Sequence, residues 1–161
     1  MSTKFGTLDT LAERLEEDRQ AGLTIAFANG LFDILHVGHL RYLQGAAAEA
    51  DRLIVAINSD ASARRLKGPS RPIVPEAERA EMIAGFGCVD YITIFDDPDV
   101  RPLLRRLRPN VHCKGSDYTP ETVPERDVAG ELGIRIAIVG DEKEHATTSI
   151  IEEIRKRDQP A

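Results

Sequence analysis

IAFANGLFDILHVGHLRYLQG, residues 25–45, is the stretch that decides the fold. A short apolar run is followed by Asn29-Gly30, and a helix-compatible segment begins at about Val37 and extends to about Ala50. Apolar residues followed by a glycine turn and then by helical spacing predict a strand, a turn, a loop and a helix. This segment is therefore expected to begin an alternating arrangement of strands and helices.

Two histidines lie where the predicted helix begins. His36 and His39 are three residues apart, which places them on one face of the first turn, and Gly38 between them leaves the backbone open to a ligand. The first turn of a helix also presents free N–H groups and the positive end of its dipole. We therefore expect a phosphate site here. A zinc site is not expected, because no third ligand follows at a fixed spacing.

The rest of the chain alternates apolar strands with helices. We expect strands at 53–57, 90–95, 110–114 and 134–139, and helices at 8–20, 60–66, 76–86, 98–107, 121–132 and 147–157. A strand, a helix and a strand within about 35 residues form a βαβ unit, whose two strands are parallel. The predicted fold is α/β: a Rossmann-like, doubly wound, five-stranded parallel sheet with helices on both faces. Such sheets bind ligands beyond the carboxyl ends of their strands.

Length and composition limit the possible classes of protein. The 161 residues predict a single domain, with a covering helix in residues 1–22 and the core in residues 23–157. The apolar runs are shorter than the roughly 20 residues that span a bilayer, so we expect a cytoplasmic protein with no membrane partner. The net charge of −6 disfavours a nucleic-acid surface. Cys88 and Cys113 lack the spacing of a metal or redox motif.

The chemistry of phosphate transfer matches the residues present. The sequence contains no GxxxxGK[ST], no GxGxxG after the first strand and no Ser-His-Asp order. In nucleotidyl transfer the attacking phosphate is already ionised at neutral pH and needs no general base. Catalysis then consists of aligning two anions and stabilising the charge on the departing pyrophosphate. Imidazoles and lysines can provide this.

Five sequence blocks in this order resemble one family. They are residues 29–39 around HVGH, 51–60, 66–72 (LKGPSRP), 114–118 (KGSDY) and 146–151 (ATTSII). Together they resemble the HxGH nucleotidyltransferases, or cytidylyltransferase-like superfamily, and within it the bacterial D-glycero-beta-D-manno-heptose 1-phosphate adenylyltransferases. The resemblance extends from about Thr24 to about Arg155. It implies Mg²⁺ bound with ATP and a homodimer, and no protein side chain is assigned as a metal ligand.

The resemblance also implies roles for individual residues. Those expected in catalysis are His36, His39 and Lys67. Those expected to bind the nucleotide are Leu31, Phe32, Gly38, His39, Asn58, Lys114, Thr147, Thr148 and Ser149. Those expected to bind the sugar phosphate are Asp33, Arg71, Arg79 and Asp117.

Several of these residues have a second interpretation. By the resemblance Asp33 is either a contact to the sugar phosphate or a metal-associated group, and it is also suited to capping a turn; Arg79 is also suited to a structural ion pair. Lys67 and Arg71 lie in a basic, proline-stiffened loop that either neutralises phosphates or is an ordinary surface. Lys114 and its neighbours fit either the nucleotide or the acceptor.

Three other groups are also open to more than one interpretation. Thr147, Thr148 and Ser149 are equally suited to capping a helix. His112 is expected to pack inside a strand, and the role of His145 is undecided.

Two departures from the family pattern bear on the substrate. Ala146 stands where the family often has a serine, which removes one hydroxyl from the triphosphate site. The glycerol-3-phosphate cytidylyltransferases have an arginine just before this helix, whereas residues 141–145 here read DEKEH. The second departure favours the heptose branch.

The function expected from the sequence is therefore an adenylyltransferase. It converts ATP and a heptose 1-phosphate to ADP-heptose and pyrophosphate for cell-surface glycan synthesis of the lipopolysaccharide type. The alternative enzyme is a cytidylyltransferase that acts on glycerol 3-phosphate or a related alcohol phosphate. The alternative from another class is a nucleotide-binding regulatory domain without catalysis. Physical argument from the residues alone leaves the choice between ATP and CTP open.

Overall fold

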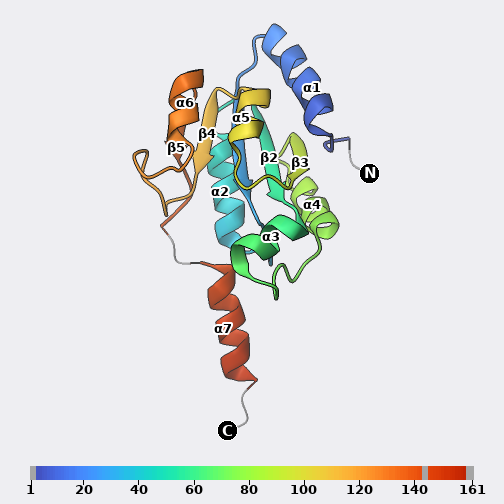
Figure 1. Cartoon of the computed structure of the whole chain (residues 1–161), viewed down its shortest axis with the longest axis vertical. Coiled ribbons are helices and arrows are strands. Elements are labelled where there is room, and N and C mark those ends of the chain that lie inside the picture. The colour runs from blue at the N-terminus through green and yellow to red at the C-terminus, as the bar shows by residue number, and fades with distance from the viewer. Residues whose placement is uncertain (1–2, 143–144, 159–161) are drawn as a thin grey trace.

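The computed structural model describes residues 3–142 and 145–158, and Figure 1 shows its architecture. Five parallel strands form one sheet in the order β3-β2-β1-β4-β5. Their bounds are β1 (Ile25–Gly30), β2 (Arg52–Asn58), β3 (Tyr91–Phe95), β4 (Val111–Lys114) and β5 (Arg135–Ile138). The expected five-stranded parallel sheet is confirmed.

Helices cover both faces of this sheet. The helices of the described chain are α1 (Leu8–Gln20), α2 (Val37–Ala47), α3 (Asp60–Lys67), α4 (Glu76–Ala84), α5 (Arg101–Leu107), α6 (Arg126–Leu132) and α7 (Thr147–Arg157), and the last of these lies away from the sheet. Buried side chains of α2 and α4 pack on one face, and those of α1, α5 and α6 pack on the other. The connections from β1 to β2 and from β2 to β3 therefore cross one face of the sheet, and those from β3 to β4 and from β4 to β5 cross the other. This is the doubly wound arrangement that the sequence predicts.

The strand order reverses between β1 and β4. From β1 the chain adds β2 and then β3 on one side, and it returns to place β4 and β5 on the other. Loops that leave β1 and β4 at their carboxyl ends therefore diverge and leave a crevice, which is where ligands bind in such sheets. Asn29 and Gly30 end β1 at this point, and Lys114 ends β4.

Some element boundaries differ from the sequence prediction. β1 continues through Gly30, and α2 ends at Ala47 rather than at about residue 50. Helix α5 begins at Arg101 rather than residue 98, because the Asp99 carboxylate accepts a hydrogen bond from the Arg101 N–H and turns the chain there.

The largest difference is at α6. This helix begins at Arg126 rather than residue 121. The residues before it instead form a turn, in which the Thr122 hydroxyl accepts a hydrogen bond from the Thr119 N–H. Pro124 has no N–H to donate to a preceding helical turn.

Helix α7 differs from the other six helices in its placement. It has no buried residue and points away from the sheet, with only its first turn close to the body (Figure 1). Within the described residues, no helix is both long and apolar enough to span a membrane. The expected single domain includes residues 1–2, 143–144 and 159–161, which lie outside the described part.

Candidate active site

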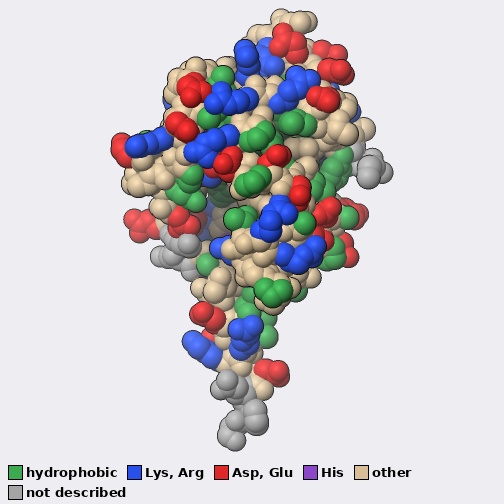
Figure 2. Space-filling view, in the orientation of Figure 1, with side chains coloured by type: hydrophobic (Ala, Val, Ile, Leu, Met, Phe, Trp, Pro, Cys, Tyr) green, Lys and Arg blue, Asp and Glu red, His purple; other side chains and the backbone are tan. Residues whose placement is uncertain are grey.

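A cleft lies beyond the carboxyl ends of β1 and β4. It has a volume of about 300 Å³ and is formed by the loop after β1, the start of α2, the loop after β4 and the segment that enters α7. The molecular surface is hollowed just above α7, and side chains of both charges surround the hollow (Figure 2). Predicted site residues that line the cleft are Leu31, Phe32, Asp33, His36, Gly38, His39, Lys67, Arg71, Asp117, Thr147 and Thr148.

The two histidines form the N-terminal cap of α2. His36 is the N-cap residue, and its Nδ1 accepts a hydrogen bond of 3.1 Å from the Gly38 N–H. The Nδ1 of His39 accepts one of 3.3 Å from the His36 N–H. The two rings stack with centroids 3.9 Å apart. A nitrogen that accepts a hydrogen bond carries no proton, so both neutral rings carry theirs on Nε2. Each imidazole is thereby fixed as a hydrogen-bond donor.

The histidines are neutral at physiological pH. Burial disfavours the charged ring of His39, His36 repels its charge, and the Asp33 carboxylate only partly offsets both, so the pKa of His39 falls to about 4. Burial and the charge of His145 also lower the pKa of His36. The site therefore offers two oriented N–H donors rather than two cations.

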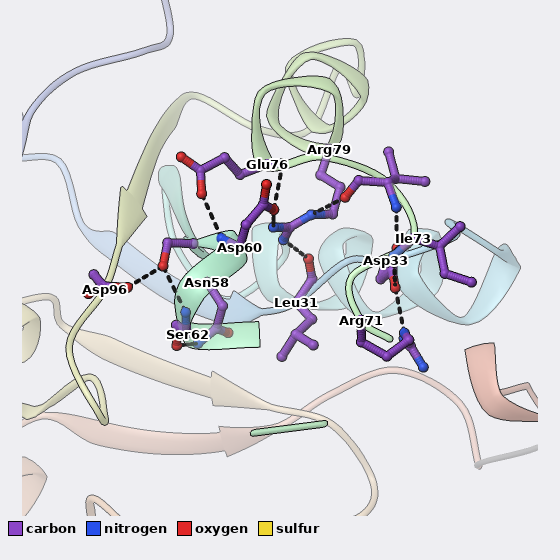
Figure 3. Close-up of polar contacts among 12 residues, drawn as sticks. Leu31, Asp33, Asn58, Asp60, Ser62, Arg71, Ile73, Glu76, Arg79 and Asp96 are labelled. Atoms are coloured by element: carbon purple, nitrogen blue, oxygen red, sulfur yellow. Dashed lines mark hydrogen bonds and ion pairs between the residues drawn. The ribbon is translucent and has the colours of Figure 1, made fainter. Parts of the chain in front are cut away.

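Asp33 holds the basic loop in place. Its carboxylate is 2% exposed, accepts a hydrogen bond of 2.6 Å from Arg71 Nε, and accepts others from the N–H groups of Ile73 and Val74 (Figure 3). Burial alone raises the pKa of Asp33, but these donors outweigh it and hold that pKa below its usual value. The contacts seen are therefore those of a residue that positions the loop, and they leave Lys67 exposed at the cleft.

The loop after β1 has a strained backbone. Phe32 and Ile34 have φ angles of +53° and +49°, a region that residues with a Cβ rarely adopt. The Thr147 hydroxyl donates a hydrogen bond of 2.6 Å to the Asp33 carbonyl, which lies between them. Strain of this kind persists only where neighbouring contacts impose it, and it concentrates at functional sites.

Arg79 lies behind the cleft wall. Its side chain is 1% exposed and donates to the Leu31 carbonyl, to the Val74 carbonyl at 2.9 Å and to the Asp60 carboxylate at 2.8 Å (Figure 3). These contacts correspond to the structural ion pair that the sequence left as an alternative. Asp60 is the partner that sequence reasoning did not identify, because nothing in its spacing links α3 to α4.

A second cavity of about 510 Å³ adjoins the first. The two share Asn29, Gly30, Leu31, Tyr42, Lys67, Gly115 and Asp117. The predicted site residues Asn58 and Lys114 line only this second cavity. The Asn58 amide donates to the Ser62 hydroxyl at 2.9 Å. Sequence reasoning did not foresee that the site has two compartments.

Three further residues lie at the edges of the site. Ser149 is exposed on α7 and does not line the cleft. His145 lines it, with its ring 6.4 Å from that of His36. His112 is fully buried in β4 and packs edge-on against Phe27, as expected for a packing residue.

The described residues contain no group of three His, Cys, Asp or Glu side chains that is suited to hold a metal ion. The Asp33 carboxylate in the cleft is already engaged by Arg71 and two N–H groups.

Comparisons with known proteins identify similar chains. A family model described as cytidylyltransferase-like matches residues 27–156. The chain is 45% identical over 155 residues to a protein of Syntrophotalea carbinolica named bifunctional protein HldE, and the match covers 96% of this chain and 32% of the relative. It is 46% identical over 151 residues to the protein of that name from Geobacter metallireducens, with 94% and 31% covered. The chain thus spans about a third of the length of these relatives.

A solved structure has a similar fold. It is the lipopolysaccharide core biosynthesis protein from Thermoplasma volcanium GSS1, with a TM-score of 0.64 and 25% sequence identity. The match covers 76% of this chain and 100% of that chain. The overall fold is therefore similar at a low level of sequence identity.

Proposed function

The chain belongs to the cytidylyltransferase-like family, and from this premise we propose that it transfers the adenylyl group of ATP to a heptose 1-phosphate. The products are ADP-heptose and pyrophosphate. Two observations support this proposal. The chain matches part of relatives that are named bifunctional protein HldE, and the similar protein from Thermoplasma volcanium is named a lipopolysaccharide core biosynthesis protein. We propose a corresponding role for this chain in the synthesis of a cell-surface glycan, in the cytoplasm.

The pair of neutral imidazoles is the observation that carries this proposal. In the transfer, an oxygen of the acceptor phosphate attacks the α-phosphorus of ATP, and the bond from that phosphorus to the bridging oxygen of the β-phosphate breaks. Negative charge grows on the non-bridging and departing oxygens. Nε2–H donors that are already oriented stabilise such charge without reorganisation. His36 and His39 hold this orientation through their Nδ1 bonds to the backbone.

The start of α7 and the basic loop complete the phosphate site. Thr148 lines the cleft at the first turn of α7, where unpaired N–H groups favour an anion. Lys67 reaches the same cleft from the end of α3. We assign the pyrophosphate end of ATP to α7 and the α-phosphate to the neighbourhood of Lys67.

The acceptor then belongs in the second cavity. In-line displacement requires the attacking oxygen to lie opposite the departing pyrophosphate. The second cavity meets the first at Lys67 and Gly115, on the side away from α7. Mg²⁺ is proposed to enter bound to the triphosphate, where it supplies additional charge neutralisation.

The assembly proposed for the chain follows the family resemblance. We propose that residues 1–161 form one nucleotidyltransferase domain and that it acts as a homodimer. The substrate partners are ATP and the heptose 1-phosphate. We assign no nucleic-acid or membrane partner. On the face shown in Figure 2 acidic and basic side chains are interspersed, which does not favour a polyanion.

The alternative enzyme is a cytidylyltransferase that acts on glycerol 3-phosphate. Pyrophosphate release with each of the four nucleoside triphosphates and each of the two acceptors distinguishes the two. We expect ATP with the heptose 1-phosphate to give the highest kcat/KM. A higher kcat/KM for CTP with glycerol 3-phosphate would replace the substrate assignment and keep the reaction class.

A variant separates the enzyme from a regulatory nucleotide-binding domain. His39→Ala removes one oriented donor, which we expect to lower kcat by roughly a hundredfold, with a smaller effect on the dissociation constant of ATP. Equal turnover by the variant and the wild type would remove His39 from the reaction. Nucleotide binding without turnover by the wild type would favour the regulatory domain.

A further inference from the structure

One oxygen of a buried carboxylate at the wall of the second cavity accepts no hydrogen bond from the described residues. The side chain of Glu125 is 6% exposed, and its Oε2 accepts no hydrogen bond from any described residue. Glu125 lies immediately before α6. Buried carboxylate oxygens are normally paired, because an unpaired one loses its hydration without compensation. Apart from its ion pair with Lys114, this oxygen therefore has acceptor capacity that the described residues do not use.

Lys114 fixes this carboxylate in place. Its Nζ lies 3.7 Å from Glu125 Oε2, too far for a hydrogen bond but close enough for an ion pair. The same ammonium donates to Asn29 Oδ1 at 3.4 Å and lies 4.9 Å from the centre of the Tyr118 ring. Burial lowers the pKa of Lys114, while the charge of Glu125 acts to raise it. The pair is thus held at the end of β4.

Part of the remaining wall suits the carbon face of a sugar, although Asn58, Asp99 and Asp117 also line the cavity. Leu66, Phe95, Val100 and Pro124 line it with apolar groups, and Tyr118 adds an aromatic ring. Apolar surfaces accommodate C–H groups, and a carboxylate accepts hydrogen bonds from hydroxyl groups. A phosphate is unsuited to this end, because it brings negative charge against Glu125. An acceptor therefore enters with its hydroxyls toward Glu125 and its phosphate toward Lys67.

We propose that Glu125 is a specificity-determining residue that accepts hydrogen bonds from the ring hydroxyls of a polyhydroxylated sugar phosphate, and that Lys114 is its positioning residue. This inference rests on the proposed function and identifies which part of the acceptor the second cavity recognises. Hydroxyl-reading sites discriminate strongly, because a substrate that lacks the hydroxyl leaves buried polar groups unpaired. Glycerol 3-phosphate, which is shorter, does not fill the same positions.

The test combines a protein variant with altered acceptors. Steady-state kinetics are measured for the wild type and Glu125→Gln with ATP, using the heptose 1-phosphate and a set of analogues that each lack one ring hydroxyl. We expect Glu125→Gln to lower kcat/KM for the complete acceptor about tenfold or more, chiefly through the KM of the acceptor. The KM of ATP should be unchanged. At least one deoxy analogue should be used equally well by both proteins.

A matched control addresses the loss of charge. Glu131→Gln, on α6, makes the same change at an exposed position where the partner is Arg105. We expect it to leave all kinetic parameters unchanged. An equal loss by Glu125→Gln on every acceptor, including all deoxy analogues, would overturn the proposal and make Glu125 a structural residue.

A double variant keeps the proposal testable if Glu125→Gln does not fold. Glu125→Gln leaves the Lys114 ammonium buried without its counter-ion, whereas Lys114→Met combined with Glu125→Gln removes both charges. The double variant is expected to fold and to lose the discrimination between the complete and deoxy acceptors. Discrimination that persists in a folded double variant would also overturn the proposal.

Binding separates this inference from the proposed reaction. If the wild type shows no turnover, calorimetric titration with the heptose 1-phosphate tests the cavity directly. If the wild type binds the heptose 1-phosphate without turnover and Glu125→Gln weakens that binding about tenfold, the proposed reaction is rejected and the role of Glu125 in recognising hydroxyl groups is retained. Equal binding by the two proteins, or no binding by either, would reject the proposed role of Glu125.

Discussion

The Thr147 hydroxyl and the Asp33 carbonyl are joined by a hydrogen bond of 2.6 Å. This bond connects the first residue of α7 to the strained loop after β1, which are 114 positions apart in the sequence. The hydroxyl is therefore engaged by the backbone, while the first N–H groups of α7 stay at the cleft. Thr147 couples the position of the triphosphate site to that of the loop that precedes the histidines.

Removing this hydroxyl tests the coupling. Thr147→Val keeps the shape of the side chain and loses the hydrogen bond to the loop that holds Phe32 and Ile34 at positive φ. We expect kcat/KM to fall by roughly tenfold, an effect comparable to one hydrogen bond. Thr147→Ser should retain activity. Steady-state kinetics of both variants measure this, and equal activity of the valine variant and the wild type would contradict it.

Gly38 tests the packing of the two histidine rings. A Cβ at this position would lie 2.9 Å from Cε1 and Nδ1 of His36, closer than Cβ atoms are found to other groups. Gly38→Ala should therefore displace the His36 ring and lower kcat by roughly tenfold or more, the scale of losing an oriented donor. Gly130→Ala, in α6, meets nothing within 4 Å and serves as the control. Equal kcat in the two variants would show that the position of the His36 ring does not affect turnover.

Lys67 should act through charge at long range. Lys67→Ala is expected to raise the KM of a phosphate-bearing substrate. It should also make that KM less dependent on ionic strength, because the variant lacks the attraction between Lys67 and the phosphate that salt screens in the wild type. Lys156→Ala removes an exposed lysine of α7 that lies outside the cleft and should change neither. The measurement is KM at several salt concentrations. The same salt dependence in Lys67→Ala as in the wild type would contradict the role.

Stability should fall as the pH is lowered from 7 to 5. The pKa of His112 is lowered to about 3 and that of His39 to about 4, both first by burial, from an ordinary value of 6.5. Between these values and 6.5 the unfolded chain binds more protons than the folded one, so folding stability rises with pH in this window.

For His112 alone the expected loss of stability from pH 7 to 5 is about 2 kcal/mol. Urea denaturation at each pH measures it. His112→Gln should reduce this loss and leave the part that His39 contributes. A stability that is constant from pH 7 to 5 in the wild type would contradict the burial of the neutral rings.

Much of the fold is predictable because local patterns decide it. Apolar runs separated by helical spacing specify parallel strands, and the HVGH segment specifies a helix start at the end of β1. The family resemblance of the five blocks is confirmed by the family model that matches residues 27–156. These features follow from residues that are close in the sequence.

The features that the sequence did not reveal depend on contacts across the chain. Arg79 fits a phosphate contact and an ion pair equally well until Asp60 is placed 2.8 Å from it. Glu125 lies inside a segment expected to be helical, and nothing in the sequence shows that β4 brings Lys114 beside a carboxylate oxygen that accepts no hydrogen bond. The roles of the predicted site residues stay predictions, to be tested by the variants above.

Helix α7 has a consequence for the dynamics of the site. Because none of its residues is buried, the helix can unfold without opening either apolar cluster of the sheet, at a free energy well below that of global unfolding. Amide hydrogen exchange should therefore be fast along α7. A bound triphosphate that caps the first turn adds its binding free energy to this local equilibrium. Nucleotide concentration would then set how much of α7 is helical at any moment.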